Sequence, residues 1–143
     1  SLQPRISTQT ISAFEKTEIA HIAEHSENDL DKSQIMKICY SNGINISSDF
    51  TKSKLNKTQP KYWANPNKRF LSQDWWLVLL NNTKREMYIF MIPRHSIKAE
   101  LMCYKTEDLI DLQIYSDLYS YPDFQDSRSG IKFKQWLVAT ISY

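Results

Sequence analysis

Residue types that build small catalytic motifs are scarce in this sequence. It has two Gly, two Cys and three His among 143 residues. The two glycines, Gly43 and Gly130, are too far apart in the chain to form a glycine-rich loop that cradles phosphates. No Cys-x-x-Cys pair occurs, which excludes the common zinc and redox motifs built on paired cysteines. These absences favour a protein that is not an enzyme, and we expect no cofactor.

Long apolar runs are absent as well. The longest is far shorter than the ~20 residues that a membrane-spanning helix needs, and we identify no signal peptide. We therefore expect a cytoplasmic protein without membrane contact. In a reducing cytosol Cys39 and Cys103 are expected to remain thiols in apolar surroundings, although their spacing alone leaves a single disulfide open.

The net charge of +2 hides a strong segregation of charge along the chain. Residues 50–73 contain no acid and carry six cations: Lys52, Lys54, Lys57, Lys61, Lys68 and Arg69. Residues 107–126 contain no Lys or Arg, and residues 15–31 hold six acids against one Lys. Because local charge steers binding even when the total is near zero, these segments are the first candidates for contact with a partner.

Helical patterns lie mainly in the N-terminal part, residues 1–47, and Ser96 is expected to cap one further short helix that runs through Glu100 to Lys105. A capping box predicts a helix over 13–26. A second helix is expected over about 30–42, with Asn28 or Asp29 as its N-cap.

Strand patterns dominate residues 74–143. Two aromatic and β-branched runs flank a polar turn and predict a hairpin at 75–92, buried on both faces. Four strands are expected in one sheet: 75–80, 87–92, 109–115 and 131–141, the last of them bent near Gln135. The basic residues 48–73 contain two prolines and are expected to form a long loop. The whole chain, 1–143, is therefore predicted to be a single α+β domain, in which N-terminal helices pack on a mixed, mostly antiparallel sheet.

The basic segment predicts nucleic-acid binding. Lys and Arg neutralise phosphates and release counterions, and aromatic faces stack on bases. The residues expected to make these contacts are Lys52, Lys54, Lys57, Lys61, Tyr62, Trp63, Lys68 and Arg69. The alternative is a solvated Lys-rich loop whose aromatic residues anchor it to the core.

Residues 74–97, DWWLVLLNNTKREMYIFMIPRHSI, resemble the late core strands of restriction-endonuclease-like domains from bacterial restriction–modification systems. The shared pattern is an Asp, an apolar strand, a polar turn, a second strand and Ile-Pro, and residues 129–138 add a similar closing strand. The resemblance implies a DNA-binding domain, with DNA a better expected partner than RNA, in a bacterial restriction or defence protein.

The same resemblance carries no catalytic residue to this chain. Those nucleases hold Mg²⁺ and a water with an Asp and a following acid-x-Lys. No Asp or Glu here is followed two residues later by Lys, and Asp126-Ser-Arg128 is the nearest approach. The resemblance therefore implies a partial nuclease fold or a binding domain cut from a larger enzyme.

The acidic segment 107–126 offers a second class of function. It is interpreted as a solvated face or, because it carries three tyrosines, as a surface that docks a protein partner. The acids and tyrosines that would form that surface include Asp117, Asp123, Tyr115, Tyr119 and Tyr121.

A third class comes from "HIAEH" at 21–25, which has the H-x-x-E-H spacing of a zinc-hydrolase site. It resembles inverzincin metallopeptidases, which implies His21 and His25 as ligands, Glu24 as general base and Glu100 as a third ligand. Glu18 lies on the same helical face. However, Ile19, Ile22 and Ala23 define the apolar stripe on another face, so the histidines are expected to point to solvent and no metal site is predicted.

Overall fold

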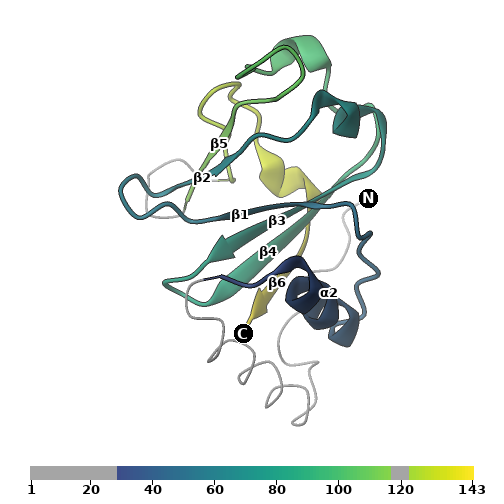
Figure 1. Cartoon of the computed structure of the whole chain (residues 1–143), viewed down its shortest axis with the longest axis vertical. Coiled ribbons are helices and arrows are strands. Elements are labelled where there is room, and N and C mark those ends of the chain that lie inside the picture. Colours follow the sequence, from purple (N-terminus) through teal and green to yellow (C-terminus); the bar gives the residue numbers. More distant parts are fainter. Residues whose placement is uncertain (1–28, 117–122) are drawn as a thin grey trace.

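The computed structural model describes residues 29–116 and 123–143, and Figure 1 shows their arrangement. A four-stranded sheet crosses the middle of the molecule in the order β1-β3-β4-β6. Its strands are β1 (Thr51–Lys54), β3 (Trp75–Asn81), β4 (Glu86–Ile92) and β6 (Leu137–Ser142). β1 pairs parallel to β3, and the other two pairs are antiparallel. The predicted α+β class and the mostly antiparallel sheet are confirmed.

The hairpin predicted at 75–92 is the centre of this sheet. β3 and β4 pair antiparallel from Trp75 opposite Ile92 to Asn81 opposite Glu86. Residues facing both sides of the hairpin are buried, as the near-continuous apolar runs predicted. Leu77 and Leu79 belong to one core cluster, whereas Val78 and Leu80 belong to the other.

The helix α2 (Lys32–Ser41) covers one face of the sheet and buries Ile35, Ile38 and Cys39 there. Its N-cap is Asp31, not the predicted Asn28 or Asp29, because Gln34 completes a capping box with Asp31. The helix is followed by a Schellman motif centred on Gly43, whose φ is 74°. In this motif the Gly43 N–H donates to the Tyr40 carbonyl, and the Ile44 N–H donates to the Cys39 carbonyl. The helix predicted over 13–26 lies outside the described residues.

The opposite face of the sheet is covered by a second, two-stranded sheet. β2 (Lys61–Ala64) and β5 (Leu112–Tyr115) pair antiparallel, and Figure 1 places them above the main sheet. Three short 3-10 helices complete this layer: η2 (Lys68–Ser72), η3 (Ala99–Leu101) and η4 (Phe133–Trp136). Trp75 lies fully buried in the core beneath them, edge-to-face with Phe133.

Three predictions of local structure were wrong. The basic residues 48–73 are not a loop, because they form β1, β2 and η2. The strand predicted at 109–115 exists as β5, but it pairs with β2 instead of joining the main sheet. The closing strand predicted over 131–141 begins only at Leu137, and the bend predicted near Gln135 is the 3-10 helix η4. In the first two cases pairing with a distant segment decided the outcome, and local pattern does not encode such pairing.

Candidate nucleic-acid interface

The lysines of β1 are positioned by simple strand alternation. Thr51, Ser53 and Leu55 face the second sheet, where the Thr51 hydroxyl accepts from the Trp75 indole N–H at 2.9 Å and Leu55 joins the core. Lys52 and Lys54 therefore point to the other face of β1. Because β1 is an edge strand of the main sheet, their side chains reach the surface there.

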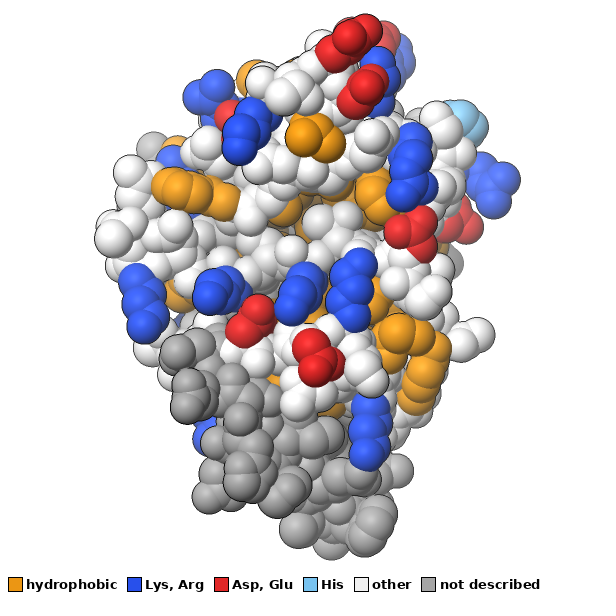
Figure 2. Space-filling view, viewed as in Figure 1, with side chains coloured by type: hydrophobic (Ala, Val, Ile, Leu, Met, Phe, Trp, Pro, Cys, Tyr) orange, Lys and Arg blue, Asp and Glu red, His pale blue; other side chains and the backbone are white. Residues whose placement is uncertain are grey.

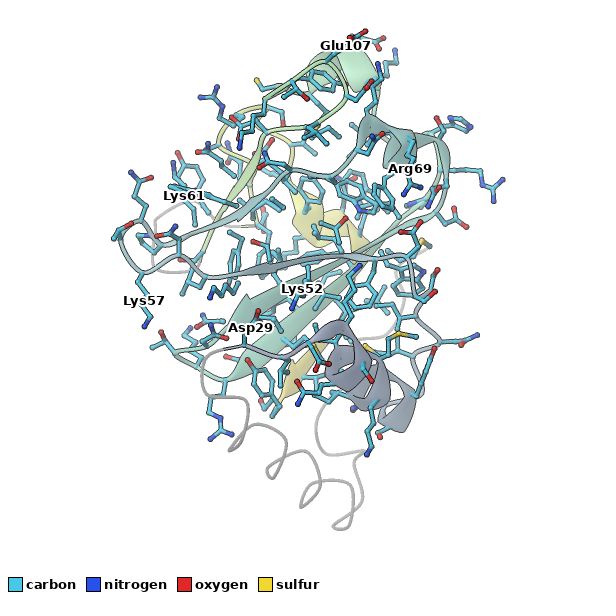
Figure 3. The ribbon with its side chains drawn as sticks, viewed as in Figure 1. Asp29, Lys52, Lys57, Lys61, Arg69 and Glu107 are labelled. Atoms are coloured by element: carbon cyan, nitrogen blue, oxygen red, sulfur yellow. The ribbon has the colours of Figure 1, made fainter. Side chains whose placement is uncertain are left out.

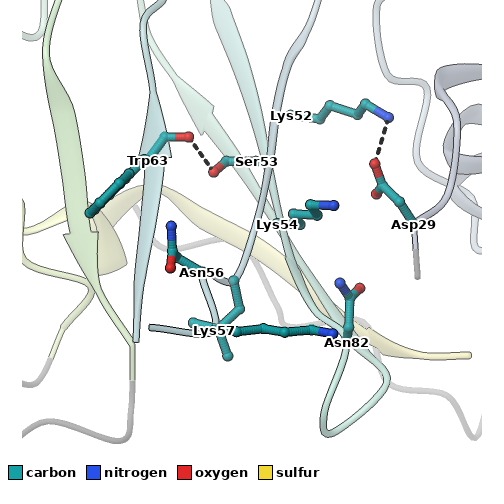
Figure 4. A pocket seen from close by; sticks show the side chains of 9 residues that line it. Asp29, Lys52, Ser53, Lys54, Asn56, Lys57, Trp63 and Asn82 are labelled. Atoms are coloured by element: carbon teal, nitrogen blue, oxygen red, sulfur yellow. Dashed lines mark hydrogen bonds and ion pairs between the residues drawn. The ribbon is translucent and has the colours of Figure 1, made fainter. Parts of the chain in front are cut away.

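Strand β2 brings an aromatic side chain beside this row. Leu55 and Tyr62 form an antiparallel bridge, and Asn56 N–H donates to the Lys61 carbonyl at 3.0 Å. The Ser53 hydroxyl donates to the Trp63 carbonyl at 2.7 Å, and Figure 4 shows this bond. The two strands thus form a bent hairpin that joins both sheets and fixes Trp63 near the lysines.

A pocket of about 510 Å³ lies between these elements. Its lining residues come from β1, the following turn, β2, the β3–β4 turn and the segment before α2: Asp29, Lys52, Ser53, Lys54, Leu55, Asn56, Lys57, Trp63 and Asn82. Figure 4 shows the indole of Trp63 edge-on at the β2 side, with Lys54, Lys57 and Asn82 at the other. The pocket therefore combines cations, amides and one aromatic face.

The three lysines of the pocket differ in how they are held. Lys52 is fixed, because its ammonium donates to Asp29 at 3.3 Å and to the Leu30 carbonyl at 2.9 Å. Lys54 and Lys57 are exposed, and neither has an ion-pair partner within residues 29–116 and 123–143. Figure 2 shows a row of cations crossing this face at the level of β1, and Figure 3 places Lys57, Lys52 and Asp29 along it. Lys54 and Lys57 are therefore the cations most available to an anion.

The pocket also contains the side-chain amides of Asn56 and Asn82, which no sequence pattern indicated. The Asn56 Oδ1 accepts from the backbone and hydroxyl of Thr58, and the Asn82 Oδ1 accepts from the Tyr143 hydroxyl at 3.4 Å. In both residues the oxygen is occupied, which leaves the Nδ2 donor for a ligand. Burial, and secondarily the Asp29 charge, raise the pKa of Tyr143 to about 12, so this hydroxyl stays protonated as a donor.

The predicted stacking role of Tyr62 was wrong. Tyr62 is only 1% exposed and belongs to the core between the two sheets, so no base can reach its ring. The neighbouring Trp63 is 45% exposed, because adjacent strand residues face opposite sides. Lys61 does not line the pocket either, and its ammonium lies 5.1 Å from the centre of the Tyr115 ring.

Lys68 and Arg69 are also separated from the pocket. They lie on η2 and line a second hollow of about 520 Å³ together with His95 and Lys98. Both cations have acidic partners at 3.4 Å, namely Asp108 for Lys68 and Asp49 for Arg69. Figure 3 shows Arg69 at the upper right of the view, well away from Lys57 at the left. The six cations of the basic segment thus do not form one surface.

The acidic segment is largely neutralised where it is described. Asp111 pairs with Arg128 at 3.2 Å and Asp123 with Lys134 at 3.7 Å, in addition to the Asp108–Lys68 pair. Asp126 is fully buried. Residues 117–122, with Asp117, Tyr119 and Tyr121, lie outside the described residues. Several of the acids that are grouped in the sequence are therefore paired in the fold with Lys and Arg from other segments.

The residues proposed for a metal site fall mostly outside the described part of the chain, namely Glu18, His21, Glu24 and His25. Glu100 is described, and it lies exposed on η3 in place of the longer helix expected to run to Lys105. Within the described residues no three His, Cys, Asp or Glu side chains converge on a point that could hold a metal ion.

The sequence matches no protein-family model, and comparisons with curated proteins and with solved structures give no significant match. Among the helices that the structure describes, none is long and apolar enough to cross a membrane.

Proposed function

We propose that this chain is a nucleic-acid-binding domain without a catalytic role, and that DNA is its partner. The observation that carries the proposal is the pocket beside β1, where Lys52, Lys54, Lys57 and the exposed ring of Trp63 meet one acid, Asp29, among the described lining residues. Neutralisation of phosphates by such cations supplies most of the affinity of non-specific nucleic-acid binding.

The spacing of the lysines supports contact with a linear anion. Lys52 and Lys54 are two residues apart on one strand, which sets their backbone positions ~6.6 Å apart along β1. Lys57 continues the row beyond the end of the strand. A row of cations on a rigid sheet edge suits a chain of phosphates better than an isolated anion, because each cation meets a separate charge.

The setting we propose is a bacterial restriction or defence protein. This rests on the resemblance of residues 74–97 and 129–138 to restriction-endonuclease-like domains. Since no acid-x-Lys motif accompanies that resemblance, the proposed role is binding, with any cleavage carried out by another domain or chain.

The test is the salt dependence of DNA binding, measured by fluorescence anisotropy on labelled duplex and single-stranded oligonucleotides. The double variant Lys54→Ala/Lys57→Ala should bind more weakly, and its plot of log affinity against log salt should be shallower by about 2, one unit per lost phosphate contact. The matched control is Lys105→Ala/Lys132→Ala, which removes the same charge at exposed positions outside the pocket.

The control variant should keep the parent's slope. Equal slopes for the parent and the Lys54→Ala/Lys57→Ala variant would show that the pocket does not contact phosphate. Equal losses in both variants would show that bulk charge alone drives binding. RNA of the same sequence, measured in parallel, tests the preference for DNA.

A further inference from the structure

Trp63 is an exposed aromatic residue whose position is held rigidly. The backbone of Trp63 pairs with Gln113 across the β2–β5 sheet, and the Trp63 carbonyl accepts from the Ser53 hydroxyl at 2.7 Å. Its side chain is nevertheless 45% exposed. A ring left 45% exposed contributes less to folding than a buried ring would, and because two strands hold the backbone of Trp63, its exposed face is placed for stacking on a flat ligand.

The dimensions of the pocket fit one nucleotide unit. About 510 Å³ lies within the range of ~300–1,000 Å³ that small-ligand sites occupy. The Nδ2 groups of Asn56 and Asn82 are donors at its wall, and they match acceptors on the edges of bases. Lys54 and Lys57 lie on the other side from the indole, where the backbone phosphates of a stacked base would pass.

We propose that this pocket receives one unpaired base, stacked on Trp63, and that the domain therefore prefers single-stranded over duplex nucleic acid. This inference rests on the proposed function. In a duplex both faces of each base are already stacked, and a base enters a pocket only after it is unpaired and flipped out, which costs free energy. In a single strand the base is free to move into the pocket, and base–aromatic stacking tolerates any sequence.

The test compares a short oligothymidylate, which forms no secondary structure, with a blunt duplex of the same length. The parent should bind the single strand more tightly than the duplex. Trp63→Ala should lower single-strand affinity by about tenfold, the order of magnitude of one base–aromatic stack, and should lower duplex affinity by a much smaller factor. Trp63→Phe should keep part of the affinity because a smaller aromatic face remains.

A second readout is tryptophan fluorescence. The chain has four Trp, of which Trp75 is fully buried, so stacking on the exposed Trp63 should quench part of the signal when oligothymidylate is added. The quenching should disappear in Trp63→Phe. The matched control is Tyr40→Ala, which removes another exposed aromatic residue, 50% exposed on α2 and outside this pocket. Thermal unfolding of each variant checks that it folds.

The outcomes separate this inference from the proposed function. Suppose that the parent binds DNA and that Trp63→Ala lowers its affinity for single strands and for duplex equally, or lowers neither affinity. Either result would show that the stacking pocket is wrong, while the proposed phosphate binding would stand. If thymidine monophosphate binds as tightly as the oligonucleotide, the site serves a free nucleotide and the strand preference is wrong. If the parent binds neither single strands nor duplex, the proposed function is wrong and this inference falls with it.

Discussion

Lys52 joins β1 to the segment before α2 through two contacts of one ammonium group, with the Asp29 carboxylate at 3.3 Å and with the Leu30 carbonyl at 2.9 Å. Asp29 is the one acid among the described residues that line the pocket. Its carboxylate therefore competes with a phosphate for the same cation. Since the Leu30 carbonyl also holds Lys52, the lysine should stay in place without Asp29.

We expect Asp29→Asn to raise the affinity for DNA several-fold at low salt. Removal of one negative charge at about 4 Å from a phosphate is worth on the order of 1 kcal/mol in water, and salt screens the gain. Anisotropy titrations at two salt concentrations measure it. Asp49→Asn is the control, because it removes the same charge beside Arg69, outside the pocket. Equal affinity in parent and Asp29→Asn would contradict a phosphate position near Lys52.

Asp126 should be a principal determinant of stability. Its buried carboxylate accepts from the Gln113 and Ser129 backbone N–H groups and from the Ser129 hydroxyl, at 2.9, 3.2 and 2.6 Å. Asp126→Ala removes the acceptor of these partly buried donors from a fully buried position and should lower the free energy of unfolding by about 2–4 kcal/mol. Urea denaturation measures the loss.

The control for Asp126 is Asp108→Ala, which removes an exposed carboxylate paired with Lys68. An exposed ion pair contributes little, so this change should stay within about 0.5 kcal/mol of the parent. Similar losses for the two variants would mean that the turn around Asp126 does not depend on its carboxylate.

The two cysteines should differ in reactivity. Cys39 is fully buried on the sheet-facing side of α2, and burial raises the pKa of its thiol to about 12. Cys103 is half-buried, and its Sγ donates to the Arg128 carbonyl at 3.3 Å. Because the thiolate is the reactive form, a disulfide reagent should label one thiol in the native protein and the second only in denaturant. Loss of the native signal in Cys103→Ala identifies the reactive residue.

Stability should fall in alkali. In the unfolded chain Cys39 loses its proton near pH 8.5, whereas in the folded chain it keeps the proton up to about pH 12. The native state thus binds more protons in this window, so the free energy of unfolding decreases as pH rises, by roughly 1 kcal/mol per pH unit. Tyr143 acts in the same direction between about pH 10 and 12.

Urea denaturation at pH 7, 9 and 10 checks the pH dependence. Cys39→Ala should be less stable than the parent at pH 7, because it leaves a small cavity, but should lose less stability between pH 9 and 10. Cys103→Ala serves as the control and should retain the parent's slope. An unchanged slope in Cys39→Ala would assign the alkaline loss to other groups.

The sequence alone determined the elements whose stability is local. The β3–β4 hairpin follows from two apolar runs around a polar turn, and α2 ends at Gly43 because glycine adopts a left-handed conformation without strain. The burial of both faces of the hairpin also followed from composition, since a strand without alternating polar residues has no face to leave in water.

Tertiary structure decided where the cations lie and which aromatic residue is exposed. Charge spacing along residues 50–73 could not show that Lys54 and Lys57 flank a pocket while Lys68 and Arg69 pair with distant acids. The sequence could not show which of Tyr62 and Trp63 is exposed, because adjacent strand residues face opposite sides. The bridge between Leu55 and Tyr62 places Tyr62 on the buried side and Trp63 on the exposed side. These features depend on pairing between segments far apart in the chain, and such pairing is set by the packing of the whole domain.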